Sequence, residues 1–227
     1  MTFTDQLRKE NDDIFELIFE HPFVTGIGKG DVPKKALEHY IKADFGYLTA
    51  FMQLYGIALS KSAAREEIGF FNEKINFVLH SESHPHHNFC DHIGVGYEEL
   101  QGYALPPTAD HYVKHMFYHA HTGSLGELIA ALLPCPWTYL EIGEQLTARY
   151  KPSEEHPFYP WITFYANPSI VELEMIHQLN KIADRAGIAE KEKMRDAFRK
   201  SCQLELGFWE MSYTCEAWPS KERAQIK

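Results

Sequence analysis

The sequence lacks the features that mark several large classes of protein. Its four cysteines, at positions 90, 135, 202 and 215, include no Cys-x-x-Cys pair and no zinc-ribbon spacing, which argues against a metal ribbon or a redox dithiol. Basic residues number 22 against 32 acidic ones. Because they gather in no cluster, they supply none of the positive stripe that a nucleic-acid surface needs. No stretch approaches the roughly 18 consecutive apolar residues of a membrane helix.

The N-terminal segment shows no pattern of a secretion signal, since charges begin at Asp5 and no apolar run follows. We therefore expect a cytoplasmic protein with reduced thiols that binds neither nucleic acid nor membrane. Hydrophobic residues make up 44% of the 227 residues and aromatic residues 14%, which is typical of a folded globular protein rather than a disordered one.

Apolar residues recur at spacings of three and four along most of the chain, and alternating strand-like runs are scarce. This pattern predicts an all-α protein. We expect a first helix over 4–20, a glycine-rich turn over 26–30, and a long second helix with Asp31 as its N-cap and Pro33 in its first turn. No repeat or long linker divides the chain, so residues 1–227 are expected to form a single domain. Further helical patterns lie at about 66–84, 85–92, 108–121, 124–133, 136–150, 167–187 and 189–216, with a loop over 151–160.

Two acidic residues fall on helix faces that are otherwise apolar. At 100° per residue, Glu205 projects from the middle of one such arc and Asp44 from another. A lone carboxylate is rarely buried, because removing its charge from water is unfavourable by several kcal/mol. Either residue alone could form a structural ion pair, but the two together favour a polar cavity inside a helical bundle. The first arc contains Met194, Phe198, Cys202, Trp209 and Tyr213, and the second contains Ile41, Leu48, Phe51 and Tyr55.

Cys135 lies between two prolines. Pro136 disfavours helical backbone at the residue before it, so a helix that restarts at Pro136 would have Cys135 as its N-cap. The helix dipole would then favour a thiolate, with Tyr139 one turn further on near the same face. The alternative is a proline kink that carries a small apolar thiol. The other three cysteines have no such setting and are expected in the core or on the surface.

The 13 histidines raise the question of a metal site. Four of them fall within 80–87, and His111, His115 and His119 are spaced by four residues. Such ladders can bind zinc or iron when carboxylates complete the site. A di-iron bundle, however, repeats a Glu-x-x-His motif on two helices, and here only Glu174 has a histidine three residues later. We interpret the histidines as solvated or hydrogen-bonded in the core, with no metal.

Six segments together resemble the TenA (thiaminase II) family, in the order in which that family has them. Any one segment is a weak signal, but the series spans nearly the whole chain, and the segment that contains Cys135 is the most specific. The resemblance implies a haem-oxygenase-like all-α fold, a homotetramer, and no cofactor. The segments are 21–24 (HPFV), 40–48 (YIKADFGYL), 111–116 (HYVKHM), 130–139 (AALLPCPWTY), 161–165 (WITFY) and 205–209 (ELGFW).

The resemblance also implies a reaction. Family members with this cysteine hydrolyse the small molecule 4-amino-5-aminomethyl-2-methylpyrimidine to 4-amino-5-hydroxymethyl-2-methylpyrimidine in thiamin salvage. They also cleave thiamin into the hydroxymethylpyrimidine and a thiazole. Carried over by motif, Cys135 would be the nucleophile and Glu205 the proton donor, and Tyr47 would help to activate the thiol.

The remaining site residues would bind the substrate. Asp44 and Tyr139 match the residues that hold the pyrimidine, and Tyr112 and Tyr165 match further tyrosines of the pocket, with Tyr165 near the acid. His86 aligns with a recurring family histidine, to which we assign no role.

Two departures and two alternatives stay open. Ala43 stands where many members have glutamine, and Phe15 stands near a position often occupied by tryptophan, so the fine substrate preference is not fixed. A different enzyme class on the same fold, an oxygenase that binds haem or a di-iron centre through the histidines, is one alternative. A non-catalytic protein that binds or senses pyrimidines is the other.

Overall fold

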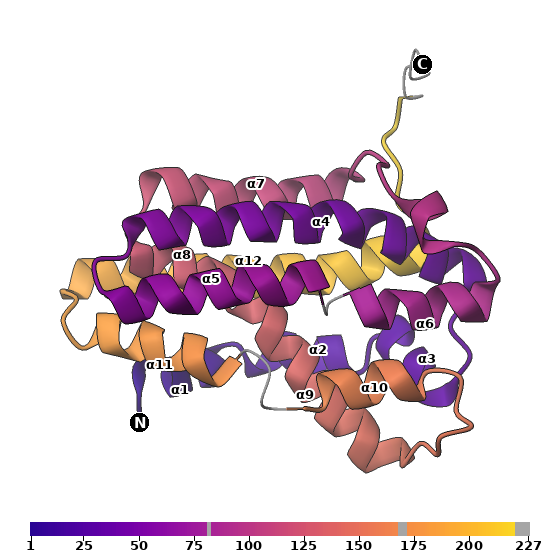
Figure 1. Cartoon of the computed structure of the whole chain (residues 1–227). Coiled ribbons are helices and arrows are strands. Elements are labelled where there is room, and N and C mark those ends of the chain that lie inside the picture. The colour runs from indigo at the N-terminus through magenta and orange to yellow at the C-terminus, as the bar shows by residue number, and fades with distance from the viewer. Residues whose placement is uncertain (81–82, 168–171, 221–227) are drawn as a thin grey trace.

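The computed structural model describes residues 1–80, 83–167 and 172–220, and every regular element in these ranges is helical (Figure 1). The expected all-α architecture is confirmed. None of the described helices is long and apolar enough to cross a membrane. The elements are α1 Phe3–Glu10, α2 Asp12–Phe19, α3 Pro22–Lys29, α4 Lys34–Lys61, α5 Arg65–His80, α6 Ser83–Ile93, the 3₁₀ helix η1 Tyr97–Leu100, α7 Pro107–Thr122, α8 Leu125–Leu132, α9 Pro134–Tyr150, α10 Tyr159–Tyr165, α11 Glu172–Ala183 and α12 Ile188–Thr214.

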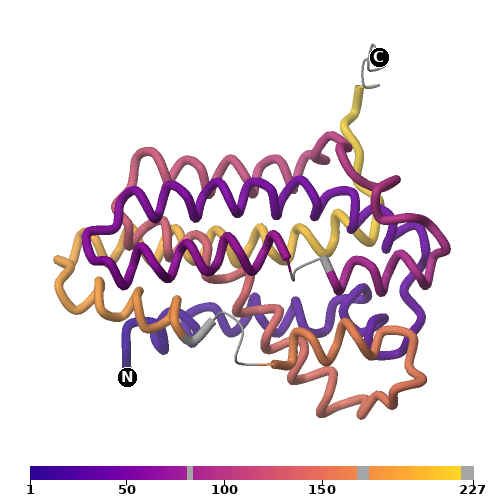
Figure 2. The backbone as a smooth tube through the Cα atoms, viewed as in Figure 1, coloured from indigo at the N-terminus to yellow at the C-terminus, as the bar shows by residue number. Residues whose placement is uncertain are grey.

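The long helix α12 is the central element of the bundle. It packs against α4, α7 and α8 on one side and against α2, α3 and α9 on the other. Figure 2 shows α4, α5, α7 and α12 extending along the same direction, while α9 and α10 lie together at one end. Buried side chains from Phe3 to Met211 join into one hydrophobic cluster. The two longest helices, α4 and α12, are in direct contact and therefore bring their inward faces together.

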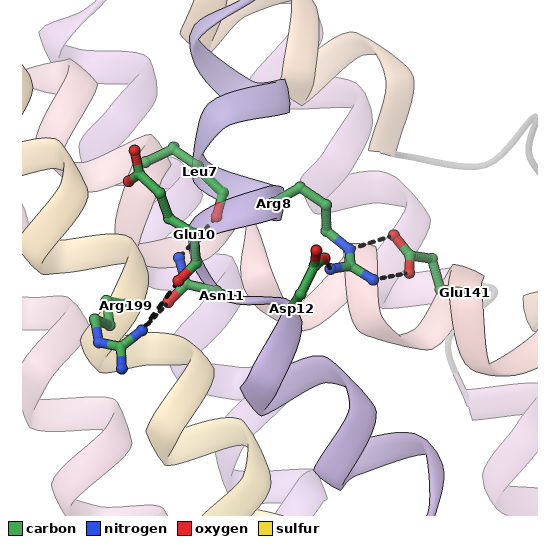
Figure 3. Close-up of polar contacts among 7 residues, drawn as sticks. All are labelled: Leu7, Arg8, Glu10, Asn11, Asp12, Glu141 and Arg199. Atoms are coloured by element: carbon green, nitrogen blue, oxygen red, sulfur yellow. Dashed lines mark hydrogen bonds and ion pairs between the residues drawn. The ribbon is translucent and has the colours of Figure 1, made fainter.

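The expected first helix over 4–20 is two helices, because the backbone breaks at Asn11 (Figure 3). The Asn11 side chain is almost fully buried; its amide nitrogen donates to the Leu7 carbonyl at 2.7 Å, and its oxygen accepts from Arg199 at 3.1 Å. An asparagine side chain that binds its own backbone offers the chain an alternative to the helical hydrogen bond. Arg8 holds the end of α1 with two hydrogen bonds to Glu141, of 2.9 and 2.8 Å.

The expected glycine-rich turn over 26–30 is also wrong, since residues 22–29 form helix α3. Pro22 occupies the first turn, where its missing N–H has no helical partner to lose, and the His21 ring accepts a hydrogen bond from the Phe23 amide. The turn is confined to Gly30, whose φ of +77° is left-handed and suits a residue without a side chain. The next helix begins at Lys34 with Pro33 rather than Asp31 as its N-cap.

Other helix boundaries differ from the sequence patterns by a few residues. Helix α5 ends at His80 and not near residue 84. The expected 151–160 loop ends at Phe158, and the unassigned segment that follows is helix α10. The expected helix over 167–187 is described only from Glu172 and ends at Ala183; its supposed first-turn residue, Pro168, lies outside the described residues.

Helices α9 and α10 approach each other so closely that a side chain larger than hydrogen cannot fit at Gly143. A Cβ atom there would lie 2.4 Å from the Ala166 nitrogen and 2.6 Å from the Tyr165 carbonyl carbon. Gly143→Ala should therefore lower the free energy of unfolding by about 1–3 kcal/mol and displace α10. As a control, Gly69 on α5 has open space around it, so Gly69→Ala should raise the free energy of unfolding by up to about 1 kcal/mol. Thermal unfolding of both variants measures this, and equal melting temperatures would disprove the tight contact.

Candidate active site

One cavity enters the bundle between α4, α5, α9 and α10 and encloses about 640 Å³ of empty space, including the part open to solvent. Four of the residues expected in the site line it: Asp44, Cys135, Tyr139 and Tyr165. Most of the remaining wall is apolar, and the stacked rings of Phe77 and Phe164 form part of it. An apolar cavity with a few converging polar groups is the usual form of a small-molecule site.

Cys135 lies inside the first turn of α9, so the expectation that it is an N-cap is wrong. Helix α8 ends at Leu132, and Leu133 retains right-handed helical backbone before α9 begins at Pro134. Prolines are tolerated in the first turn of a helix, which is why the preference against helix before Pro136 does not prevail. The proline-kink alternative describes the backbone better. The sulfur nevertheless belongs to a partly exposed residue on the cavity wall, where a ligand can reach it.

Glu205 lies on α12 with 2% of its surface exposed, as its place in the apolar arc predicted. Burial, with the charge of Asp44 adding to it, raises the pKa of Glu205 to about 8, and the nearby Tyr112 hydroxyl offsets part of this rise. The side chain is therefore mostly protonated at neutral pH. The rest of the arc is buried with one exception: Tyr213, in the last turn of α12, is 36% exposed.

Tyr47 from α4 and Tyr112 from α7 lie near both the thiol and the acid, but neither they nor Glu205 are among the residues that line the cavity. Both rings are buried, and their centroids are 5.1 Å apart. Burial first, and then the charges of both Cys135 and Glu205, raise the pKa values of the two phenols well above the ordinary value. Both hydroxyls therefore stay protonated within electrostatic reach of the sulfur and the carboxyl. The Tyr112 hydroxyl forms no well-aligned hydrogen bond with any side chain in the described ranges, and the Tyr47 hydroxyl points toward the Met116 sulfur at 3.9 Å.

Tyr139 and Tyr165 form an aromatic wall next to the cysteine. Their ring centroids are 4.7 Å apart, and the planes are inclined at 57°. The Tyr139 hydroxyl is 2.8 Å from the Tyr40 hydroxyl. Burial is the main cause that raises the pKa of Tyr139, and the nearby Asp44 charge contributes, so this wall adjoins the carboxylate. The expected proximity of Tyr165 to the acid stays a prediction.

Asp44 is held by His86, a histidine to which the sequence analysis assigned no role. The His86 ring is fully buried, its Nε2 is 2.7 Å from Asp44 Oδ2, and its Nδ1 is 3.2 Å from the Tyr97 hydroxyl. Four histidines within eight residues left no means of deciding which one faces α4. The signal that could have found it is the carboxylate itself, because an aspartate on an apolar helix face needs a buried donor.

Two further histidines, His115 and His119, contact neighbouring helices. His115 Nε2 is 3.1 Å from Ser201 Oγ and 3.3 Å from the Ala197 carbonyl oxygen on α12, and burial lowers the pKa of His115 to about 4. His119 lies 3.5 Å from Glu127. Within the described ranges, no three His, Cys, Asp or Glu side chains are grouped as metal ligands would be. Of the other cysteines, Cys90 and Cys202 are buried and Cys215 is exposed.

A helical bundle with a reachable cysteine and a protonated carboxyl beside the same tyrosines has the parts that enzymes combine in nucleophilic and acid catalysis. The sequence profile of the TENA/THI-4/PQQC family matches residues 5–215. The chain belongs to that family.

Individual relatives agree with this membership along the whole chain. An aminopyrimidine aminohydrolase from Staphylococcus aureus (strain USA300) is 32% identical over 221 residues, which are 96% of each chain. The solved structure of a TenA homologue from P. horikoshii OT3 is 26% identical and superposes with a TM-score of 0.82, covering 94% of this chain and 99% of that one. A domain of unknown function from Shewanella denitrificans with a heme oxygenase-like fold has 11% identity and a TM-score of 0.65, and covers 94% of this chain and 93% of its own. The haem-oxygenase-like fold is confirmed, and the chain is a hydrolase of this family.

Proposed function

We propose that this chain hydrolyses 4-amino-5-aminomethyl-2-methylpyrimidine to 4-amino-5-hydroxymethyl-2-methylpyrimidine and ammonia, and that it also cleaves thiamin to the hydroxymethylpyrimidine and a thiazole. The observation that carries the proposal is that the buried Glu205 and the cavity-lining Cys135 both lie close enough to Tyr47 and Tyr112 to raise the pKa values of the two phenols. The similarity to an aminopyrimidine aminohydrolase over nearly the whole chain supports the same substrate class.

The cavity offers the contacts that an aminopyrimidine needs. One carboxylate oxygen of Asp44 accepts a hydrogen bond from His86. The other oxygen makes no hydrogen bond in the described part of the chain. That second oxygen would accept a hydrogen bond from the 4-amino group. Tyr139 and Tyr165 line the cavity and would pack against the ring, because aromatic pairs gain energy beyond simple burial.

The first half of the reaction forms a carbon–sulfur bond. The Cys135 thiolate adds to an electron-poor carbon of the pyrimidine ring while Glu205 gives its proton to a ring nitrogen. Tyr47, which keeps its proton, turns its hydroxyl from the Met116 sulfur toward the Cys135 sulfur anion and stabilises that anion with a hydrogen bond. The added electron density then expels the substituent on the exocyclic carbon, which leaves as ammonia from its protonated ammonium form or as the neutral thiazole from the thiazolium of thiamin.

The second half restores the ring. A water molecule adds to the exocyclic carbon and loses one proton to the solvent, the carbon–sulfur bond breaks, and the ring nitrogen returns its proton to Glu205. One water is consumed for each ammonia released. An acid that gives and regains a proton in each cycle works best with a pKa near the working pH, and the pKa of about 8 for Glu205 meets this requirement.

The direct test is turnover by the unmutated protein. We expect the aminomethylpyrimidine to give hydroxymethylpyrimidine and ammonia in equal amounts, and thiamin to give hydroxymethylpyrimidine and thiazole. Product chromatography and an ammonia assay measure both, and comparing the two rates shows which substrate is preferred. Binding of the pyrimidine without any product would contradict the proposal and favour a non-catalytic pyrimidine-binding protein.

We extend the proposal to the organisation of the protein. Residues 1–227 are proposed to be a single TenA-like domain, because the family profile spans 5–215 and one hydrophobic cluster joins the described helices. A cytoplasmic homotetramer is proposed from the family resemblance. Exposed apolar side chains, among them Leu17, Leu79 and Tyr118, are available for contacts between subunits.

A further inference from the structure

A buried chain of three polar side chains runs from the 3₁₀ helix η1 to the cavity. Tyr97 on η1 contacts His86 on α6, and His86 contacts Asp44 on α4 at the cavity wall. The two distances, 3.2 and 2.7 Å, are hydrogen-bond distances. The mechanism proposed above uses Asp44 and makes no use of the other two residues. His86 has none of its surface exposed, so no ligand can touch it.

The chemistry of the three groups fixes the direction of both hydrogen bonds. An ionised Asp44 can only accept, so the proton on the His86 ring must lie on Nε2. Burial first, and then the charge of Asp44, raises the pKa of Tyr97 above its ordinary value, so its hydroxyl is available as a donor to Nδ1. A neutral histidine then has one donor and one acceptor, and both are used.

We infer that His86, oriented by Tyr97, is a positioning residue that keeps the Asp44 carboxylate turned so that one oxygen faces the 4-amino group of the substrate. The inference rests on the proposed function, because it needs an aminopyrimidine as the ligand of Asp44. It assigns a function to the histidine-rich segment that the sequence left without one. It also makes the specificity for a 4-amino group depend on α6 and η1, neither of which contributes a residue to the cavity wall.

The physical reason is the isolation of the Asp44 charge. The residue is 5% exposed, and it lies close enough to the buried Glu205 for their charges to interact. Without a donor at Oδ2, the buried carboxylate would rotate toward another donor. This rotation removes the acceptor that the 4-amino group requires. The nearby tyrosines, Tyr139 and Tyr40, already bond to each other.

The test compares two substitutions of one residue. His86→Leu removes the donor at similar volume, and His86→Gln keeps an amide nitrogen that can reach Asp44. We expect His86→Leu to raise KM for the aminomethylpyrimidine about 10- to 100-fold, the effect of losing a hydrogen bond to a charged group. Its kcat should change less than about 3-fold, because the Asp44–amine contact exists in both the ground state and the transition state. His86→Gln should restore KM to within about 3-fold of the unmutated protein.

Two further variants separate positioning from general damage. Tyr97→Phe should raise KM by a smaller factor, about 2- to 5-fold, since the histidine loses only the group that selects its tautomer. His115 is a half-buried histidine that bonds to α12 and lies outside the proposed site. His115→Gln should therefore leave KM unchanged. Circular dichroism and melting temperatures establish that each variant is folded.

Several results would overturn the inference. One is an unchanged KM in folded His86→Leu. Another is equal impairment of the Leu and Gln variants, since this would assign the effect to ring shape. If kcat fell as much as kcat/KM with KM constant, Asp44 would act in the transition state and not as a binding group. A failure of the unmutated protein to bind or turn over the pyrimidine would remove the proposed function together with the inference, whereas normal turnover with unaffected His86 variants would remove the inference alone.

Discussion

Cys135→Ser should lower kcat for hydrolysis of the aminomethylpyrimidine by at least about 1,000-fold, because a serine hydroxyl is far less nucleophilic than a thiolate. KM should change little, since the proposed ring-binding residues Asp44 and Tyr139 line the cavity and are not altered by the substitution. The same loss is expected with thiamin, because both substrates share the addition step. Steady-state assays on the two substrates, with the melting temperature of the variant beside them, measure this prediction.

The control for the cysteine is Cys215→Ser. Cys215 is exposed and follows the last turn of α12, so its substitution should leave both rates unchanged. An alkylating reagent should inactivate the unmutated protein and Cys215→Ser alike, and the hydroxymethylpyrimidine should protect both. Near-normal turnover by Cys135→Ser would show that the nucleophile has been wrongly assigned.

Glu205→Gln should lower kcat by about 100- to 10,000-fold, the range expected for loss of a general acid. The amide has the same shape but no proton that can be transferred to the ring nitrogen. Because Glu205 must be protonated for the first step and its pKa is about 8, kcat/KM of the unmutated protein should fall as the pH rises above that value. The residual activity of Glu205→Gln should lack this decline.

The same substitution should stabilise the fold. The pKa of Glu205 is about 8 in the folded state against 4.5 for a solvated glutamate. The ionisation of this group therefore does not change the free energy of unfolding below pH 4.5, and it lowers that free energy as the pH rises toward 8. At 1.4 kcal/mol per pKa unit, the full loss is roughly 3–5 kcal/mol, and Glu205→Gln should avoid it. The gain in melting temperature should be large at pH 8 and small at pH 5.

Glu127→Gln is the matched control. Glu127 is also buried, in the capping box at the start of α8, and a glutamine can accept the same hydrogen bond from the Ser124 amide. This variant should keep normal turnover. Two results together would contradict the role of Glu205 as the acid. One is a mild effect of Glu205→Gln on kcat, and the other is a difference in melting temperature between this variant and the unmutated protein that stays the same at every pH.

Local sequence signals correctly predicted several features that depend on the residues of a single helix. The spacing of apolar residues placed Glu205 and Asp44 on inward faces, and both are buried in the bundle. The Ser124–Glu127 capping box was readable because its two residues are three apart, and the structure contains it. Such features depend on a single helical turn, for which the sequence holds the complete information.

Local rules failed where a distant partner overrides them. Asn11 reads as an ordinary helical residue, but it is buried against Arg199, 188 positions further along the chain, and the first helix breaks there. Glycines at 26 and 28 read as a turn, but they belong to α3 because helix packing outweighs intrinsic propensity. Cys135 is helical for a different reason, because Pro136 falls in the first turn of α9, where proline is tolerated.

The sequence by itself determined the helical class and the family, and it predicted a set of site residues, because periodicity and ordered motifs are properties of the chain. Only the tertiary structure decided which side chains meet. It brought Tyr47 and Tyr112 within electrostatic reach of both the cysteine and the acid, and it selected His86 from its neighbours as the partner of Asp44. The physical reason is that hydrogen-bond partners and desolvation are fixed by distances between helices, and no local pattern along the sequence encodes those distances.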